Sequence, residues 1–245
     1  MRKKKLFLAS LIPVIIGIIF LFSWRNDADD DRFISYIADA SKQDIAFYWK
    51  DSNEENFKSI ENLRLWLEKN NRELVFAMNG GMYRPDNSPQ GLYIENGKEL
   101  FPPDTSAGNG NFYMKPNGIF FITDDNKAVI CRTEDFHQYK DVKFATQSGP
   151  MLVIDGNIHP AFKQGSQNMN VRNGVGILPG HKLLFAMSKK EINFYDFAEY
   201  FKLMGCSNAL YLDGFVSRTY LPEKKWIQTD GNFGVIIGIS RPVNK

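Results

Sequence analysis

Four short segments of the chain carry polar side chains beside glycine, where a strand is expected to end in a tight turn. They are Met78 to Tyr83, Gln147 to Pro150, Asn168 to Gly176 and Leu212 to Ser217. Glycine lets the backbone turn sharply, so a neighbouring side chain can reach into a cleft. Among these side chains, the Asp213 carboxylate could act as a nucleophile or general base. The Arg172 guanidinium could bind two phosphate oxygens at once.

Each of these residues also has an ordinary structural explanation. Asn-Gly and Asp-Gly are common hairpin turns, so Asp213 could simply cap its turn and Asn79 could satisfy the backbone of another. Arg172 could be a surface ion-pair residue. Taken singly, the segments favour the structural explanation, and only their combination and order are specific.

In combination and in order, the segments match a known pattern. The matching residues are Asn79-Gly80-Gly81-Met82-Tyr83 with Ser88-Pro89-Gln90-Gly91-Leu92, Ser148-Gly149-Pro150-Met151-Leu152 with Asp155-Gly156, Arg172-Asn173-Gly174-Val175-Gly176, and Leu212-Asp213-Gly214-Phe215-Val216-Ser217. Together they resemble the phosphodiester glycosidase family, that of the lysosomal uncovering enzyme, over roughly residues 75 to 240. The chain departs from the family at Phe215 and Val216, because many members have Leu-Asp-Gly-Gly-x-Ser there. The bulkier side chains of Phe215 and Val216 are expected to affect the local backbone path and the choice of substrate.

The resemblance implies a hydrolase that releases a sugar, with α-linked N-acetylglucosamine the first to test, from a phosphodiester in envelope or extracellular glycans. It makes Asp213 the principal carboxylate and Arg172 the phosphate clamp. The residues that it implies for substrate binding are Asn79, Gly80, Gly81, Gln147, Ser148 and Ser217. The leaving phosphate monoester has a second pKa near 6, so one carboxylate could suffice, in either a retaining or an inverting reaction. No cofactor is implied.

Composition limits the alternatives. The net charge is only +2 and much of it lies in the first five residues, which argues against a nucleic-acid partner. His137, His159 and His181 share no ligand spacing, so no metal site is expected. Cys131 and Cys206 are interpreted first as core thiols and second as a disulfide.

The N-terminus predicts a membrane anchor. Residues 1–5 form a basic flank, and residues 6–24 form an uncharged run long enough to cross the bilayer as a helix. A cleaved signal peptide is the alternative, but no small-residue cleavage site precedes Arg25. The basic flank favours a cytoplasmic N-terminus, with the C-terminal domain outside the cytoplasm. We expect a linker and the start of the domain in residues 25–44, and a phosphodiester glycosidase-like domain in residues 45–245.

The elements that must position these residues predict an α+β fold, with a mixed, largely antiparallel sheet and a few packed helices. Apolar spacing predicts one helix near residues 53–71, capped by Ser52 or Asn53, and a second over residues 192–204 that ends at Gly205. Strands are expected at residues 74–78, 91–94, 118–123, 128–132, 151–154, 209–212 and 233–239. Residues 102–111 are expected to form a long loop.

Two other functional classes are consistent with this pattern. A catalytically inert glycan-binding domain would keep the cleft without depending on a carboxylate, and Phe215 keeps this alternative open. A structural envelope protein would expose an apolar patch in place of a polar cleft. Asp86, Asp155 and Asp230 lie near turns and are candidates for a second acid or base.

Overall fold

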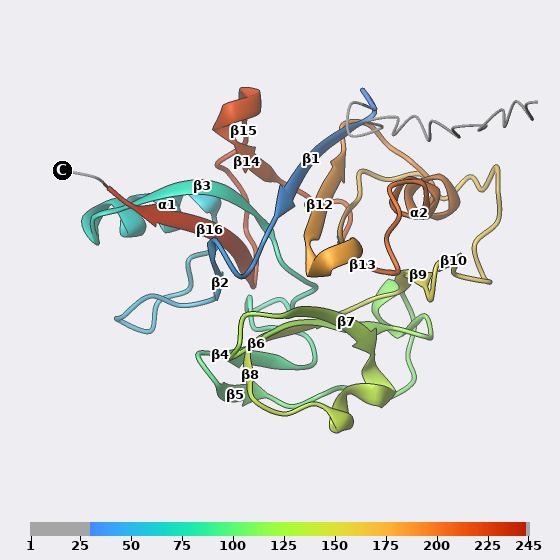
Figure 1. Cartoon of the computed structure of the whole chain (residues 1–245), viewed down its shortest axis with the longest axis horizontal. Coiled ribbons are helices and arrows are strands. Elements are labelled where there is room, and N and C mark those ends of the chain that lie inside the picture. Colours follow the sequence, from blue (N-terminus) through green and yellow to red (C-terminus); the bar gives the residue numbers. More distant parts are fainter. Residues whose placement is uncertain (1–29, 244–245) are drawn as a thin grey trace, which may run out of the picture.

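The fold is built from three antiparallel sheets and two α-helices. The structure is a computed structural model that describes residues 30–243. Every strand pairing between these residues is antiparallel. This arrangement confirms the expectation of largely antiparallel sheets with few helices (Figure 1).

Sheet 1 carries helix α2 on its outer face. Its strand order is β1-β12-β11-β13-β9-β10. The strands are β1 (Phe33–Ala38), β12 (Leu183–Ser188), β11 (Asn173–Ile177), β13 (Asn208–Asp213), β9 (Met151–Ile154) and β10 (Asn157–Ile158). Helix α2 (Phe194–Leu203) buries Phe197, Ala198 and Phe201 against this face, at the spacing of one helix side.

Sheet 2 carries helix α1 on its outer face. Its strand order is β15-β14-β3-β16-β2. The strands are β15 (Trp226–Ile227), β14 (Thr219–Leu221), β3 (Arg72–Asn79), β16 (Ile236–Pro242) and β2 (Asp44–Tyr48). Helix α1 (Ile60–Lys69) packs Ile60, Leu63 and Leu67 on this face.

Sheet 3 lies below the other two in Figure 1. Its strand order is β5-β4-β8-β6-β7. The strands are β5 (Lys98–Phe101), β4 (Tyr93–Glu95), β8 (Val142–Ser148), β6 (Gly118–Thr123) and β7 (Ala128–Arg132). The connections include short 3-10 helices at Asn111–Tyr113, Thr133–Gln138, Pro179–His181 and Pro222–Lys224.

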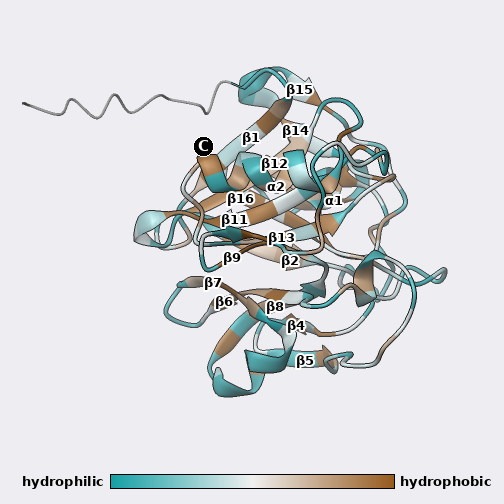
Figure 2. Cartoon of the chain, turned by 90° about the vertical axis from the view of Figure 1, so that its right-hand side faces the viewer, coloured by the Kyte–Doolittle hydropathy of each residue, from teal (hydrophilic) through white to brown (hydrophobic). Residues whose placement is uncertain are grey.

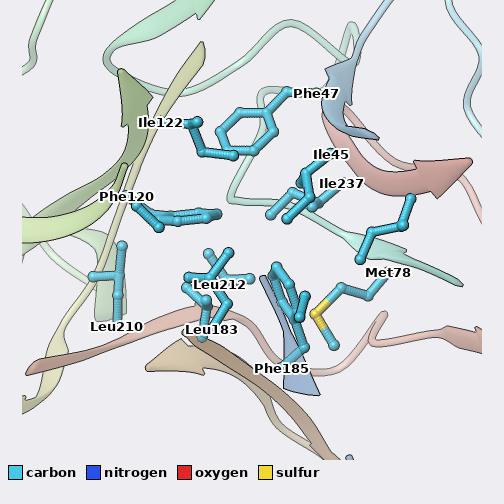
Figure 3. Close-up of a cluster of buried hydrophobic side chains, with 14 of the residues drawn as sticks. Ile45, Phe47, Met78, Phe120, Ile122, Leu183, Phe185, Leu210, Leu212 and Ile237 are labelled. Atoms are coloured by element: carbon cyan, nitrogen blue, oxygen red, sulfur yellow. The ribbon is translucent and has the colours of Figure 1, made fainter. Parts of the chain in front are cut away.

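One hydrophobic core joins the inner faces of all three sheets. Phe120 of sheet 3 lies 5.2 Å from the ring of Phe47 in sheet 2 and 6.1 Å from that of Phe185 in sheet 1. Figure 3 shows these rings converging with aliphatic side chains from the same strands. The hydrophobic colour in Figure 2 accordingly concentrates on the strands and the hydrophilic colour on the outer loops. The sheets therefore hold one another in place through shared aromatic packing.

Within residues 30–243, both helix predictions are confirmed, and one of them is wrong at its N-terminal boundary. Helix α2 begins after the N-cap Asn193 and ends just before Gly205, whose φ of +86° stops it as expected. Helix α1 begins at Ile60 with Ser59 as its N-cap, not at Ser52 or Asn53. Lys58 has a φ of +61°, and a left-handed residue cannot continue a right-handed helix toward residue 53.

The strand predictions are accurate where β-branched and aromatic residues run together. The bounds of β6, β7 and β9 agree with the expected ranges, and β3, β4, β13 and β16 overlap theirs. The end of β8 agrees with the turn expected at Gln147 to Pro150, although no bounds were predicted for this strand. Strands β1, β2, β5, β10, β11, β12, β14 and β15 were not predicted. Of these, β1 lies within residues 25–44, so part of the predicted linker and domain start is a strand paired with β12.

The predicted anchor at residues 6–24 lies outside the described residues. Within residues 30–243, no helix is both long and apolar enough to cross a membrane. Cys131 and Cys206 lie in the described part, where both are buried free thiols. Burial raises the pKa of each thiol to about 12, so both remain protonated at neutral pH.

Phe185→Ala is expected to lower the free energy of unfolding by about 3–5 kcal/mol, because it leaves a cavity where sheets 1 and 3 meet. Chemical denaturation followed by tryptophan fluorescence measures the change. Leu203→Ala, at an exposed helix end, is the control and should change stability by less than about 0.5 kcal/mol. Equal effects of the two substitutions would contradict a core shared between the sheets.

Candidate active site

The ends of three strands bring together the side chains of Asp213, Asn173 and Asn79. Strands β11 and β13 are antiparallel neighbours, and their register places Asn173, the first residue of β11, opposite Asp213, the last residue of β13. Asn79 is the last residue of β3, in sheet 2. The three residues therefore meet at the border between sheets 1 and 2.

The amide of Asn173 links the two sheets. Its Nδ2 donates to both the backbone oxygen and Oδ1 of Asn79, each at 2.9 Å. Its Oδ1 accepts a hydrogen bond of 2.8 Å from the backbone nitrogen of Asp213. Asn79 Oδ1 also accepts from the backbone nitrogen of Arg218 at 3.0 Å. Both amides are fully buried, so these hydrogen bonds fix where the backbone at Asp213 lies.

Asp213 is half-buried, and its carboxylate has no cationic partner at salt-bridge distance among residues 30–243. Its Oδ1 accepts from the backbone nitrogen of Gly214 at 2.7 Å, and its Oδ2 accepts from Asn79 Nδ2 at 3.4 Å. Burial raises the pKa of Asp213 from its ordinary 3.8 to about 6, and these two hydrogen bonds only partly oppose the rise. Burial, and then the charge of Asp213, also raise the pKa of Tyr83.

Arg172 is fully buried and pairs with no carboxylate in the described part of the chain. Its Nε donates to the Ile192 carbonyl at 2.8 Å, and its Nη2 donates to the carbonyl and Oδ1 of Asn168 at 2.8 and 3.1 Å. The guanidinium lies 3.6 Å over the ring of Phe194. Desolvation lowers its pKa, so an unpaired cation is held at a cost that a bound anion would offset.

Tyr211 connects the guanidinium with the turn that follows Asp213. Its hydroxyl is 3.4 Å from Arg172 Nη1, a long contact that leaves this nitrogen the least satisfied of the three. A Cβ placed on Gly214 would lie 2.2 Å from the same hydroxyl, so only glycine permits this approach. Burial raises the pKa of Tyr211, and the charge of Asp213 contributes to the rise. A single phenol therefore separates the buried cation from the turn that bears the carboxylate.

The comparisons with known proteins identify the family. A family model described as phosphodiester glycosidase matches residues 72–244. The chain belongs to the phosphodiester glycosidase family. It is also 36% identical over 223 residues to the uncharacterized protein YigE of Escherichia coli strain K12, which covers 89% of this chain and 85% of that protein.

Two solved structures share the fold. The catalytic domain of zebrafish N-acetylglucosamine-1-phosphodiester alpha-N-acetylglucosaminidase, auto-inhibited by its pro-peptide, matches with a TM-score of 0.56 and 16% identity. The match covers 86% of this chain and 84% of that one. A hypothetical protein from Synechocystis matches with a TM-score of 0.51 and 12% identity, over 85% of this chain and 59% of that one.

In this member of the family, four predicted substrate-binding residues make contacts that support the Asp213 turn and the adjoining strands. Ser217 Oγ donates to the Gly214 carbonyl at 2.6 Å, and Ser148 Oγ donates to the Leu212 carbonyl at 2.7 Å. The Gly80 nitrogen donates to the Val235 carbonyl at 2.8 Å, so this amide is already used. A Cβ on Gly81 would lie 2.7 Å from Thr146 Oγ1. Contact of these residues with a substrate stays a prediction.

The Gln147 amide is occupied entirely within the chain. Its Oε1 accepts from the backbone nitrogens of Leu92 and Asp104 at 2.9 and 2.8 Å. Its Nε2 donates to the Asp104 carbonyl at 2.7 Å and to Thr133 Oγ1 at 3.3 Å. Gly91 has a φ of +76°, and a Cβ there would lie 2.2 Å from Gln147 Oε1. Gln147 thus holds the loop at residues 102–104 against β4, and in this structure its side chain hydrogen-bonds to none of the residues of the Asp213 cluster.

The expectation that each polar segment ends a strand is wrong for Arg172. This residue precedes β11, which begins at Asn173. Because β11 runs antiparallel to β13, the start of one lies beside the end of the other, and Arg172 still lies near Asp213. Asn173 and Tyr211 were not predicted as site residues. The first lies within a recognised motif, whereas the second carries no signal beyond its position in an apolar strand.

The other carboxylates are dispersed. Asp230 forms an exposed ion pair with Arg218, through two contacts of 2.8 and 2.9 Å. Asp86 accepts hydrogen bonds from Ser88, and Asp155 lies exposed beyond the far end of β9. No group of three or more His, Cys, Asp or Glu residues that could hold a metal occurs among residues 30–243.

A cavity of about 830 Å³ lies away from these groups. It is lined by residues of the loop before β6, the end of β7 and the β9–β10 hairpin, including Lys115, Arg132 and Asp155. Neither Asp213 nor Arg172 lines it. Volume alone would favour this cavity, but the desolvated charges that chemistry requires lie at the border of sheets 1 and 2.

Asp213→Asn is expected to change how stability depends on pH. The carboxyl is harder to ionise in the folded chain, so between pH 3.8 and about 6 the folded state binds more protons than the unfolded state. The free energy of unfolding of the parent should therefore fall, relative to that of Asp213→Asn, by on the order of 2 kcal/mol as pH rises from 4 to 7. Denaturant titrations at several pH values measure this, with Asp155→Asn as control. Parallel curves for parent and Asp213→Asn would contradict the desolvation.

Gln147→Leu is expected to destabilise the fold by about 2–4 kcal/mol, because it leaves buried backbone groups of Leu92 and Asp104 without partners. Denaturant titration measures the loss. Gln167→Leu is the matched control, since Gln167 is exposed and its amide nitrogen bonds only to the Gly165 carbonyl. A stable Gln147→Leu variant would contradict a structural role for this amide.

Proposed function

We propose that this protein hydrolyses a sugar phosphodiester, releasing the sugar from a phosphate-linked glycan. One observation carries the proposal: the Tyr211 hydroxyl contacts the unpaired, buried guanidinium of Arg172 and approaches Gly214, the residue that follows Asp213, whose carboxyl has a raised pKa. A phosphodiester next to an anomeric carbon needs both groups, one for the carbon and one for the phosphate. Membership of the phosphodiester glycosidase family supports the same reaction.

The reaction breaks the bond between the anomeric carbon and the phosphate oxygen. The phosphate monoester leaves with the electron pair and, because its second pKa is near 6, it departs without full protonation by an acid. Ionised Asp213 either attacks the anomeric carbon, to be displaced later by water, or removes a proton from water that attacks directly. In both routes the sugar gains the hydroxyl of water, and Asp213 stabilises the positive charge that develops on the ring.

Arg172 is proposed to bind the phosphate. Its Nε and Nη2 are held by Ile192 and Asn168, which fixes the plane of the guanidinium. Its Nη1 has only the long contact to Tyr211 and is therefore the nitrogen that can donate to a phosphate oxygen. Because the cation is already desolvated, its electrostatic attraction for a phosphate would be stronger than that of an exposed arginine.

The proposed sugar is α-linked N-acetylglucosamine. This choice comes from the family resemblance and from the name of the zebrafish enzyme that shares the fold. The proposed site of action is outside the cytoplasm, with residues 6–24 as a membrane anchor or signal peptide and envelope or extracellular glycans as substrates. Protease accessibility of the domain in intact cells tests this location.

Turnover of an N-acetylglucosamine α-phosphodiester by the purified protein is the deciding measurement. Asp213→Asn is expected to lower kcat at least about 100-fold, and Arg172→Lys to lower kcat/KM by about 10-fold or more, because lysine keeps the charge but loses the planar fork. In the parent, kcat/KM should rise as pH increases through about 6, where Asp213 ionises.

Asp155→Asn and Arg132→Lys are the matched controls, since both residues lie at the separate cavity, and they should keep parental kinetics. Circular dichroism confirms that each variant is folded. Binding of the phosphodiester without release of sugar would overturn the hydrolase and would support a glycan-binding domain in its place. Sugar release that survives Asp213→Asn would overturn the assigned carboxylate.

A further inference from the structure

Phe215 presents its aromatic ring to solvent two residues after the candidate catalytic carboxylate. Its side chain belongs to a residue that is 88% exposed, the highest value among the large apolar residues exposed in residues 30–243. Exposed apolar residues are common on protein surfaces, so exposure alone carries no function. The position of this residue, on the turn that bears Asp213, is what separates it from the others.

The turn that carries Phe215 is fixed on both sides. Ser217 donates to the Gly214 carbonyl through its backbone nitrogen at 2.7 Å and through its hydroxyl at 2.6 Å. Arg218, which follows, donates its backbone nitrogen to Asn79 and forms two contacts with Asp230 through its guanidinium. The ring therefore projects from a backbone that is held in place, and ordering it for a ligand costs little more than its own rotamer freedom.

The neighbouring loop carries a second exposed apolar side chain. The Val171 carbonyl lies 3.6 Å from the position of a Cβ on Gly214, so the two loops touch. Met169, on this loop, is 41% exposed and directly follows Asn168, which holds the guanidinium of Arg172. Polar residues lie close by in the chain, Asn168 next to Met169 and Arg218 after Phe215. A lipid surface would need a larger continuous patch.

We propose that Phe215, with Met169 beside it, forms a binding platform for a sugar ring in the leaving group, on the far side of the phosphate from the bond that breaks. This inference rests on the proposed function. Arg172 is fully buried and Asp213 is half-buried, so a phosphate that contacts Arg172 must lie deeper than the Phe215 ring. A ring this exposed lies farther out and can contact only the part of the substrate that extends outward. The C–H face of a pyranose packs on such an aromatic surface.

Two N-acetylglucosamine α-phosphodiesters test the platform, one with the phosphate esterified to a methyl group and one with it esterified to a hexose. Phe215→Ala is expected to raise KM for the hexose diester about 10-fold, with kcat within about 2-fold, and to leave the methyl diester unchanged. Phe215→Trp should restore KM, and its fluorescence should change when the hexose diester binds. Leu203→Ala, an exposed apolar residue on α2, is the matched control.

Equal effects of Phe215→Ala on both diesters would overturn the inference, because the ring would then contact the released sugar. Unchanged kinetics with weaker sedimentation on phospholipid vesicles would also overturn it, in favour of a lipid contact. If the parent turns over neither diester, the proposed hydrolase fails, and calorimetric binding of the hexose diester decides the platform by itself. A roughly 10-fold higher Kd in Phe215→Ala then supports it, and an unchanged Kd rejects it.

Discussion

The buried amide of Asn173 is the interaction on which the site depends. It bonds to Asn79 in sheet 2 and to the backbone nitrogen of Asp213 in sheet 1. The two sheets could pack through apolar side chains alone, but apolar contacts are not directional and tolerate small shifts. Hydrogen bonds of 2.8–2.9 Å between fully buried groups do not tolerate such shifts, because a displaced amide would remain unpaired. The position of the candidate catalytic carboxylate is therefore tied to the docking of one sheet on the other.

The site contains two ionisable groups of opposite charge, and burial disfavours the charged form of each. Asp213 has a raised pKa and Arg172 a lowered pKa, and burial is the first cause of both shifts. The two charges do not neutralise each other directly, since the Tyr211 hydroxyl and Gly214 lie between them. A substrate that brings a phosphate to Arg172 and a developing positive charge to Asp213 would lower the free-energy cost of burying each of these charges. The fold thus offsets a local loss of stability with the aromatic core that joins the three sheets.

Much of the secondary structure can be predicted from the sequence alone. Strands β6, β7 and β9 are runs of β-branched and aromatic residues, and α2 shows apolar residues at helical spacing before a glycine stop. These features act locally, so residue type alone is enough to predict them. Helix α1 was extended too far because one left-handed residue, Lys58, carries no signal in its residue type. Strand β1 and its partner β12 were missed, since their pairing joins residues far apart in the chain.

The sequence by itself determined the family and the largely antiparallel character of the sheets, and its short motifs around glycine turns singled out Asp213 and Arg172 as site candidates. Only the tertiary structure decided how each polar group is used. It showed that Gln147 bonds within its own chain, that Asn173 links two sheets, that Arg172 has no carboxylate partner in the described residues and that Phe215 faces solvent. Burial and hydrogen-bond partners arise from contacts between residues distant in sequence, and no residue type or spacing specifies them.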